Sequence, residues 1–236
     1  MNFDFIFFDE IKSTNDFAKE KKIKSPTVIM ARVQSGGRGR MGRTFISEEG
    51  GLYFSAVLPT GYLSCSLSLC TAAAAVAVRR VLFEKTGKPL CIKWVNDILL
   101  DGKKVCGILS ETVTENGYPE SVIVGIGVNL IEPKDGFAPE IRHRAGAIGY
   151  FTDTEGAKEL AFAISEELSG LVRCSDGEII SLYREHLAFV GENITATDYK
   201  SGEVHSGKIV SVSEAGELLL KTENGDVLLS SGEILY

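Results

Sequence analysis

The sequence has few of the residues and spacings that mark disulfide-bonded or zinc-binding proteins. Its 236 residues include five cysteines, an odd number, and no two of them form a CxxC pair. The three histidines show no metal-ligand spacing. Disulfide frameworks and structural zinc sites depend on such pairs. The pattern therefore predicts reduced thiols, a cytoplasmic location and no permanently bound metal.

Signals for a membrane or a nucleic-acid partner are also missing. Residues 1–12 lack the basic region and the cleavage site of a signal peptide. The longest apolar stretch, residues 67–78, is alanine-rich and shorter than the roughly 20 residues that span a bilayer. The net charge of −7 disfavours a protein that coats nucleic acid, because neutralising phosphates needs a positive surface. We expect neither partner.

The apolar pattern predicts a larger mixed domain followed by a small β module. Strands are expected at residues 3–8, 27–33, 52–58, 91–94, 98–100, 104–113 and 121–128. The turn signals Asp101-Gly102 and Asn116-Gly117 predict that the last three form an antiparallel meander. Helices are expected from Ser13 onward, at residues 67–85 with Gly87 after the end, and at 155–173 and 177–186, and a loop is expected at 34–43. Residues 131–150 have no clear pattern. From Val190 onward, four short runs at 193–197, 204–212, 217–221 and 227–229 predict a barrel-like module.

A glycine–arginine segment, Gly36 to Arg43, is the strongest local signal. Glycines allow close backbone approach, and arginines donate to phosphate and carboxylate groups. Such a loop would stay mobile and irregular until anions neutralise it. It is neither a Walker loop nor a dinucleotide fingerprint. Taken alone, it also fits a flexible basic linker or a binder of single-stranded nucleic acid.

Four further clusters combine polar groups with strand or helix ends, and each also has a purely structural explanation. Ser13-Thr14-Asn15 opens a helix, so capping alone explains it. Residues 93–97, Lys-Trp-Val-Asn-Asp, end a strand and could be an ordinary polar turn. Residues 125–129, Gly-Ile-Gly-Val-Asn, end another strand, where GxG is common.

The fourth cluster is residues 104–107, Lys-Val-Cys-Gly, at a strand start. Strand alternation predicts that Lys104 and Cys106 share one face and that Val105 lies on the other. Gly107 inside the strand marks a close approach of ligand or backbone. An edge lysine is the structural alternative.

The order of these motifs along residues 11–129 carries a resemblance. The chain reads STN, QSGGRGRMGR, KWVND, KxxG and GxGxN, and this order resembles the biotin protein ligase family. The resemblance implies an α+β fold: a mixed central sheet flanked by helices, related to class II aminoacyl-tRNA synthetases, with a small C-terminal SH3-like β-barrel. It implies a catalytic domain at residues 1–188 and the barrel at 189–236.

The resemblance also implies an activity and its partners. The family makes biotinyl-5′-AMP from biotin and MgATP and then transfers biotin to one lysine of a biotin carboxyl carrier protein. Relatives are often homodimers. Only twelve residues precede Ser13, so we expect a monofunctional ligase without the N-terminal DNA-binding domain that some members carry.

Site residues follow from the same resemblance. Those implied as catalytic are Lys104, Arg38, Arg40 and Asp97. Those implied to bind biotin are Ser13, Thr14, Asn15, Gln34, Gly37, Arg38, Arg40, Lys104 and Gly107. Those implied to bind ATP or the adenylate are Arg38, Arg40, Arg43, Phe45, Lys93, Asn96 and Asn129. No residue is assigned to a resident metal.

The sequence departs from the family pattern at three positions. Val95 stands where proline is usual, Met41 where a further arginine is common, and Phe45 where tryptophan is frequent. Two rival hypotheses stay open at this point. One is an enzyme of the same fold that activates lipoate or octanoate, and the other is a nucleic-acid-binding module.

Overall fold

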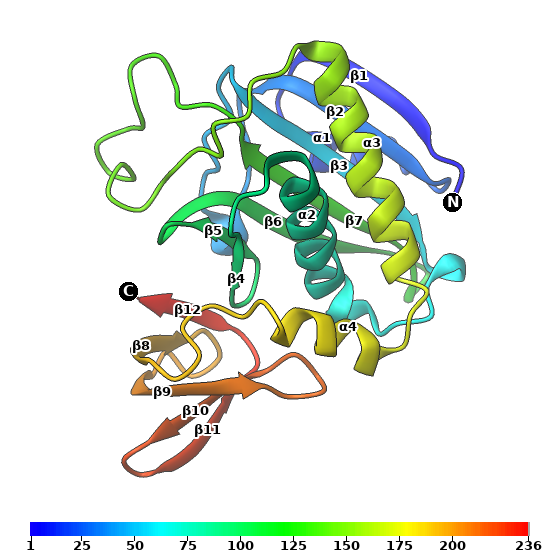
Figure 1. The fold of residues 1–236 in the computed structure, drawn as a ribbon. Coiled ribbons are helices and arrows are strands. Elements are labelled where there is room, and N and C mark those ends of the chain that lie inside the picture. Colours follow the sequence, from blue (N-terminus) through cyan, green and yellow to red (C-terminus); the bar gives the residue numbers. More distant parts are fainter. Residues whose placement is uncertain (236) are drawn as a thin grey trace.

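The computed structural model describes residues 1–235 and contains two sheets with four α-helices (Figure 1). A seven-stranded sheet has the order β1-β2-β3-β7-β6-β5-β4, and a separate five-stranded sheet is built from residues near the C-terminus. No helix in the described part of the chain is long and apolar enough to cross a membrane. The mixed sheet and the antiparallel C-terminal unit confirm the predicted α+β class.

The large sheet is mixed because β1 and β2 run parallel while all its other neighbours are antiparallel. Its strands are β1 (Asp4–Ile11), β2 (Thr27–Gln34), β3 (Gly51–Pro59), β4 (Cys91–Lys93), β5 (Asp97–Leu100), β6 (Lys103–Glu115) and β7 (Tyr118–Asn129). Two hairpins join β5, β6 and β7. Asp101-Gly102 and Asn116-Gly117 all have positive φ, as two-residue hairpin turns of type I′ require. The predicted antiparallel meander is therefore confirmed.

The two faces of this sheet are covered by α1 (Thr14–Glu20), α2 (Cys70–Thr86) and α3 (Thr154–Leu171), whereas α4 (Asp176–Arg184) packs against α2 and β9. The alanine-rich α2 is buried along most of its length and packs with α3 on one face. On the other face, Ala18 of α1 packs on Ile29, Val57 and Ile123. The short α1 leaves the rest of its face uncovered, which makes room for a pocket there.

One helix prediction and one loop prediction need small corrections. The predicted helix over 67–85 is a 3₁₀ turn, Leu67–Leu69, followed by α2. Gly87 ends α2 with φ of 67°, the left-handed C-cap conformation that glycine adopts without a Cβ penalty. The predicted irregular loop over 34–43 begins with the last residue of β2 and contains a 3₁₀ turn at Arg40–Gly42.

The C-terminal module contains one strand more than the pattern predicted. Its strands are β8 (Asn193–Asp198), β9 (Val204–Val212), β10 (Leu218–Thr222), β11 (Gly225–Leu229) and β12 (Gly232–Leu235), in the order β11-β10-β9-β8-β12. The missed β12 has four residues and pairs with β8 rather than with its sequence neighbour. Trp94 donates from Nε1 to the Gly216 carbonyl (2.9 Å), so the module is tied to the end of β4.

Residues 130–153 form neither helix nor strand, and they include the segment 131–150 for which the sequence showed no clear pattern. In Figure 1 part of this segment projects from the body before the chain enters α3. Its later part is held by backbone hydrogen bonds. Lys104 donates to the Arg144 carbonyl (2.7 Å), and Ile148 donates to the Asn129 carbonyl (2.8 Å). The segment therefore bridges the start of β6 and the end of β7.

Candidate functional site

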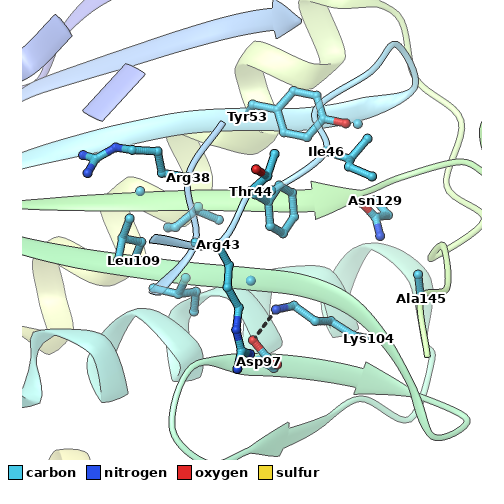
Figure 2. A pocket seen from close by; sticks show the side chains of 18 of the residues that line it. Arg38, Arg43, Thr44, Ile46, Tyr53, Asp97, Lys104, Leu109, Asn129 and Ala145 are labelled. Carbon is cyan, nitrogen blue, oxygen red and sulfur yellow. Dashed lines mark ion pairs between the residues drawn. The ribbon is translucent and has the colours of Figure 1, made fainter. Parts of the chain in front are cut away.

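A pocket lies on the α1 side of the large sheet, over the first half of β6 and the last part of β7 (Figure 2). Gly107 of β6 stands opposite Gly127 of β7 in the strand register. A Cβ at Gly127 would lie 2.5 Å from the Phe45 ring, and one at Gly107 would lie 2.9 Å from it. The glycine pair therefore creates a bare stretch of sheet on which an aromatic ring packs directly.

The structure brings all but one of the predicted site residues to this pocket. They are Ser13, Thr14, Asn15, Gln34, Arg38, Arg40, Arg43, Phe45, Lys93, Asn96, Asp97, Lys104, Gly107 and Asn129. The exception is Gly37, which is buried beneath the glycine–arginine loop. A Cβ there would lie 2.5 Å from Ser47 Oγ, and its carbonyl accepts from the Phe45 amide (2.9 Å). Gly37 thus closes the loop rather than lining the pocket.

Ser13 and Thr14 serve the helix start and the pocket wall in different ways. Ser13 Oγ accepts from the Asp16 amide, so its side chain caps α1. Thr14 donates through its amide (2.9 Å) and through its hydroxyl (3.2 Å) to Gln34 Oε1. Gln34 Nε2 donates in turn to Ser47 Oγ (3.1 Å). The capping explanation therefore holds for Ser13, while Thr14 belongs to a network that faces the pocket.

Asn15 is held from both ends of its amide. Its Nδ2 donates to Glu111 Oε2 (2.8 Å), and its Oδ1 accepts from Ser55 Oγ (2.6 Å). Glu111 also accepts from Lys19. Burial disfavours the ionised form of Glu111, but donation from Lys19 and Asn15 outweighs that effect and lowers the pKa of the carboxyl. Sequence reasoning missed Glu111, whose place in the middle of a long strand gives no local signal.

The glycine–arginine loop folds into a tight turn. Gly39 donates to the Arg43 carbonyl (2.7 Å), and Arg38 bridges to Thr44. Met41 has φ of 56° and Gly42 has φ of 72°. A methionine in this left-handed region is uncommon, so Met41 costs conformational energy that a glycine would avoid. Its side chain is exposed at the tip.

Each arginine of the loop has acceptors from the protein itself. Arg38 Nη2 lies 2.7 Å from both Asp16 Oδ1 and Glu111 Oε2. Arg40 Nη1 donates to Asn96 Oδ1 and to the Gly232 carbonyl, each at 3.3 Å. Burial lowers the pKa of the Arg40 guanidinium. The loop that was predicted to wait for an external anion is therefore already ordered by internal acceptors.

Arg43 binds two residues of the C-terminal module. It makes a bidentate ion pair with Glu233 at 2.7 and 2.5 Å, and it donates to the Tyr199 hydroxyl (2.9 Å). Hydrogen bonds from Arg43 lower the pKa of Glu233 to about 2. Glu233 sits on β12, the strand that the pattern missed, so its contact with a loop 190 residues away in sequence had no sequence signal.

Lys104 reaches the pocket because β6 contains a bulge. Ile98 pairs with Cys106 and Leu99 with Lys104, which leaves Val105 as an extra residue. Val105 and Cys106 both join the core, so the prediction that Lys104 and Cys106 share a face is wrong. A bulge re-aims the side chains on either side of it. Lys104 consequently lies on the Gly107 side.

The redirected Lys104 meets Asp97 across the strand pair. Its Nζ lies 2.6 Å from Asp97 Oδ1 and 5.8 Å from the centre of the Phe45 ring. In Figure 2 the Lys104–Asp97 ion pair and Arg38 lie at opposite ends of the pocket, and the Arg38 guanidinium points away from the ion pair. One pocket therefore holds a polar network at the α1 end and an ammonium group at the other.

Lys93 and Asn96 belong to the same end as Lys104. Lys93 is 6% exposed, and burial lowers the pKa of its ammonium group. Asn96 donates from Nδ2 to the Ile108 carbonyl (2.8 Å), which orients its Oδ1 toward Arg40. The two side chains are fixed by the turn between β4 and β5.

The remaining wall comes from the segment that the sequence left unassigned. Asn129 donates from Nδ2 to the Gly146 carbonyl (2.9 Å). Phe137, Ile141 and Arg144 from this segment also line the pocket. They were missed because the segment has no periodic pattern that would assign its side chains to a face.

The pocket can hold an anionic ligand and stabilise charge on it. Lysine and arginine side chains near a buried anion favour the negative charge that develops in group transfer. Within residues 1–235 no cluster of three or more histidine, cysteine, aspartate or glutamate side chains could hold a metal ion. The polar side chains that line the pocket include cations, amides and the Asp97 carboxylate.

Comparisons with known proteins identify the family. Residues 7–129 match the biotin/lipoate A/B protein ligase family, and residues 189–235 match the biotin protein ligase C-terminal domain. The bifunctional ligase/repressor BirA of Bacillus spizizenii is 31% identical over 97% of this chain and 73% of its own length. The biotin–[acetyl-CoA-carboxylase] ligase of Paracoccus denitrificans is 31% identical over 88% of this chain and 89% of its own.

Solved structures agree with these sequence matches. The biotin protein ligase of Aquifex aeolicus, in complex with biotin and ATP, superimposes with a TM-score of 0.82 and 31% identity over 98% of this chain and 97% of that chain. Its R40G mutant, in complex with biotin, also has a TM-score of 0.82, with 30% identity over 98% of each chain. Two family matches and whole-length similarity thus converge: the chain belongs to the biotin protein ligase family and is a ligase.

Proposed function

We propose that this ligase makes biotinyl-5′-AMP from biotin and MgATP and then transfers the biotinyl group to one lysine of a biotin carboxyl carrier protein. The observation that carries the proposal is the single pocket with two unlike ends. The polar network at Asn15 and Gln34 suits the ureido ring of biotin. The cations Lys104, Lys93 and Arg40 suit the carboxylate and the phosphates. The relative from Aquifex aeolicus binds biotin and ATP.

In the first step, an oxygen of the biotin carboxylate attacks the α-phosphorus of ATP and pyrophosphate leaves. Two anions must approach each other, so the step needs positive charge between them. Lys104 is our candidate for the main cation, because the bulge places its Nζ on the pocket side of β6, beside Asp97. Arg38 and Arg40 are candidates for binding both substrates, and Mg²⁺ arrives with ATP and offsets charge on its phosphates.

The nucleotide would occupy the end of the pocket near the C-terminal module. The Asn129 amide would offer the adenine a polar contact, and the Phe45 ring would offer it a flat aromatic surface. Lys93 and Asn96 would face the phosphates, and Arg43 would move with the loop. Gly107 and Gly127 let the Phe45 ring pack directly on the sheet.

In the second step, the amine nitrogen of the carrier lysine attacks the acyl carbon, and AMP leaves with the electrons of the C–O bond. The amine must lose a proton to become a nucleophile. Asp97, beside Lys104, is our candidate for accepting that proton. The mixed anhydride is readily hydrolysed, so the closed glycine–arginine loop would exclude water until the carrier arrives.

The experiment that tests the proposal is ATP–pyrophosphate exchange with biotin, lipoate and octanoate supplied in turn. Exchange with biotin alone supports it. Exchange with lipoate or octanoate and none with biotin contradicts the substrate assignment, while binding of nucleic acid without any exchange would favour the rival module. Assembly as a homodimer and a cytoplasmic location stay predictions.

A further inference from the structure

One carboxylate outside the pocket contacts two of the pocket's polar side chains. Glu111 lies on β6, and its side chain is 20% exposed. Its Oε2 accepts from Asn15 Nδ2 (2.8 Å) and Arg38 Nη2 (2.7 Å), and its other oxygen accepts from Lys19. Glu111 is not one of the residues that line the pocket, so it can influence a bound ligand only through Asn15 and Arg38.

The contact with Asn15 decides which end of its amide faces the ligand. A carboxylate accepts hydrogen bonds and donates none, so Glu111 selects the NH₂ group of Asn15. That group also reaches the Leu109 carbonyl at 3.4 Å. Both of its hydrogens are therefore used inside the protein. The oxygen, which accepts from Ser55, is left as the part of Asn15 that a ligand can meet.

The contact with Arg38 fixes the loop at the same end. Arg38 Nη2 is shared between Glu111 and Asp16. Its Nε is buried and has no hydrogen-bond partner among the described residues. A buried, unpaired guanidinium N–H is costly, and an acceptor on a bound ligand would remove that cost. Glu111 thus holds Arg38 where one donor stays available.

We propose that Glu111 is a positioning residue that sets the donor and acceptor pattern of the acid-binding end by fixing the Asn15 amide and the Arg38 guanidinium. The proposal rests on the proposed function, because it takes the acid bound at this end to be biotin. It predicts a larger effect on biotin than on ATP, because ATP would also meet Lys93, Lys104 and Arg40, which Glu111 does not contact.

The test compares Glu111→Gln with a matched control on the same strand, Glu115→Gln. Both carboxylates pair with a lysine near α1, Lys19 and Lys24, but only Glu111 contacts Asn15 and Arg38. An amide at position 111 can turn its own NH₂ toward Asn15, which removes the preference between the two ends of the Asn15 amide. In ATP–pyrophosphate exchange we expect the biotin KM to rise about 10- to 100-fold, the ATP KM to change less than about threefold, and the control to match the parent.

Two further variants separate positioning from general stabilisation. Lys19→Met removes the third contact of Glu111 and should leave the biotin KM within about threefold of the parent. Asn15→Ala combined with Glu111→Gln should raise the biotin KM by less than the product of the two single effects, because coupled side chains are not additive. Biotin binding measured by calorimetry gives the same comparison without turnover.

The outcomes separate this inference from the proposed function. A parent chain without biotin-dependent exchange contradicts the function itself. An active parent whose biotin KM is unchanged in Glu111→Gln, or whose ATP KM rises as much as the biotin KM, overturns the role of Glu111 alone. A Lys19→Met variant as impaired as Glu111→Gln would show that the carboxylate serves only to stabilise the fold, and would overturn the role as well.

Discussion

At the α1 end of the pocket, Asn15, Gln34 and Arg38 bind neighbours within the large domain, whereas at the other end Arg40 and Arg43 bind acceptors of the C-terminal module. The first end is a closed network of amides, hydroxyls and carboxylates. The second is a set of cations whose present partners are protein oxygens. A phosphate carries the same type of acceptor, so it can replace those partners without new side chains.

This difference indicates how one pocket handles two ligands. An acid with a rigid polar ring is recognised best by groups whose directions are already fixed, because less order must be imposed on binding. A flexible, highly charged nucleotide is bound by long cationic side chains that exchange partners. Each of the three predictions below changes a residue at one end of the pocket or a contact between the glycine–arginine loop and its neighbours.

The largest effect is expected at Lys104, which lies at the end of the pocket opposite Arg38. Lys104→Ala removes the cation nearest Asp97 and should reduce biotin-dependent ATP–pyrophosphate exchange by about 10³-fold, as the loss of a transition-state contact does. Circular dichroism should show an unchanged fold, because Lys104 lies outside the core. The adjacent, exposed Lys103→Ala is the matched control and should retain exchange. Parent-like exchange in Lys104→Ala refutes its catalytic role.

Arg40→Gly weakens the contact between the loop and the second end. It removes the donors to Asn96 and the Gly232 carbonyl, so the adenylate should still form but should escape from the protein about tenfold faster. Rapid gel filtration of the enzyme–adenylate complex measures this release.

The control for Arg40→Gly is Met41→Gly, which adds a glycine to the same turn without removing a guanidinium. Met41 has φ of 56°, a conformation that glycine adopts easily. The Met41→Gly variant should retain the adenylate as the parent does. Equal retention in Arg40→Gly and the parent would contradict the role of the loop.

The smallest effect is expected at Glu233, which joins the loop to the C-terminal module. Its folded-state pKa of about 2 lies below the ordinary value of 4.5. Its contribution to folding stability is therefore present above pH 4.5 and is lost as the pH falls toward 2. Because Arg43 is half exposed, Glu233→Gln should lower the free energy of unfolding at pH 7 by only about 1 kcal/mol.

Thermal unfolding of the parent and Glu233→Gln at pH 7 and pH 2.5 checks this dependence. The difference in melting temperature between the parent and Glu233→Gln should be smaller at pH 2.5 than at pH 7. Glu214→Gln, whose partner Arg184 lies away from the loop, serves as the control and should show a smaller gap at pH 7. A gap for Glu233→Gln that is constant with pH would show that the ion pair does not cause it.

Local sequence patterns predicted what depends on neighbours in the chain. Turn pairs such as Asn116-Gly117 need positive φ at both positions, so they located the hairpins directly. The alanine-rich α2 was recognised from its composition and from Gly87 at its end. The predicted site residues share one pocket because their motifs lie where β2, β4, β6 and β7 begin or end and where α1 begins, and the fold brings these element ends together.

Features that depend on distant contacts could not be predicted. The bulge at Val105 follows from the pairing of β5 with β6, and strand alternation therefore placed Cys106 on the wrong face. Glu111 and Glu233 gain their importance from partners 73 and 190 residues away. β12 is too short to stand out and is stabilised by pairing with β8.

We propose that one end of the pocket binds biotin, the other binds ATP, and the two react to give an adenylate that a carrier lysine consumes. A single-turnover experiment tests this reaction directly: the purified chain is mixed with biotin and MgATP, the protein-bound products are separated, and a biotin carboxyl carrier domain is then added. We expect protein-bound biotinyl-5′-AMP, followed by AMP release and biotin on one carrier lysine. Failure to form the bound adenylate, or an adenylate that the carrier does not consume, would contradict it.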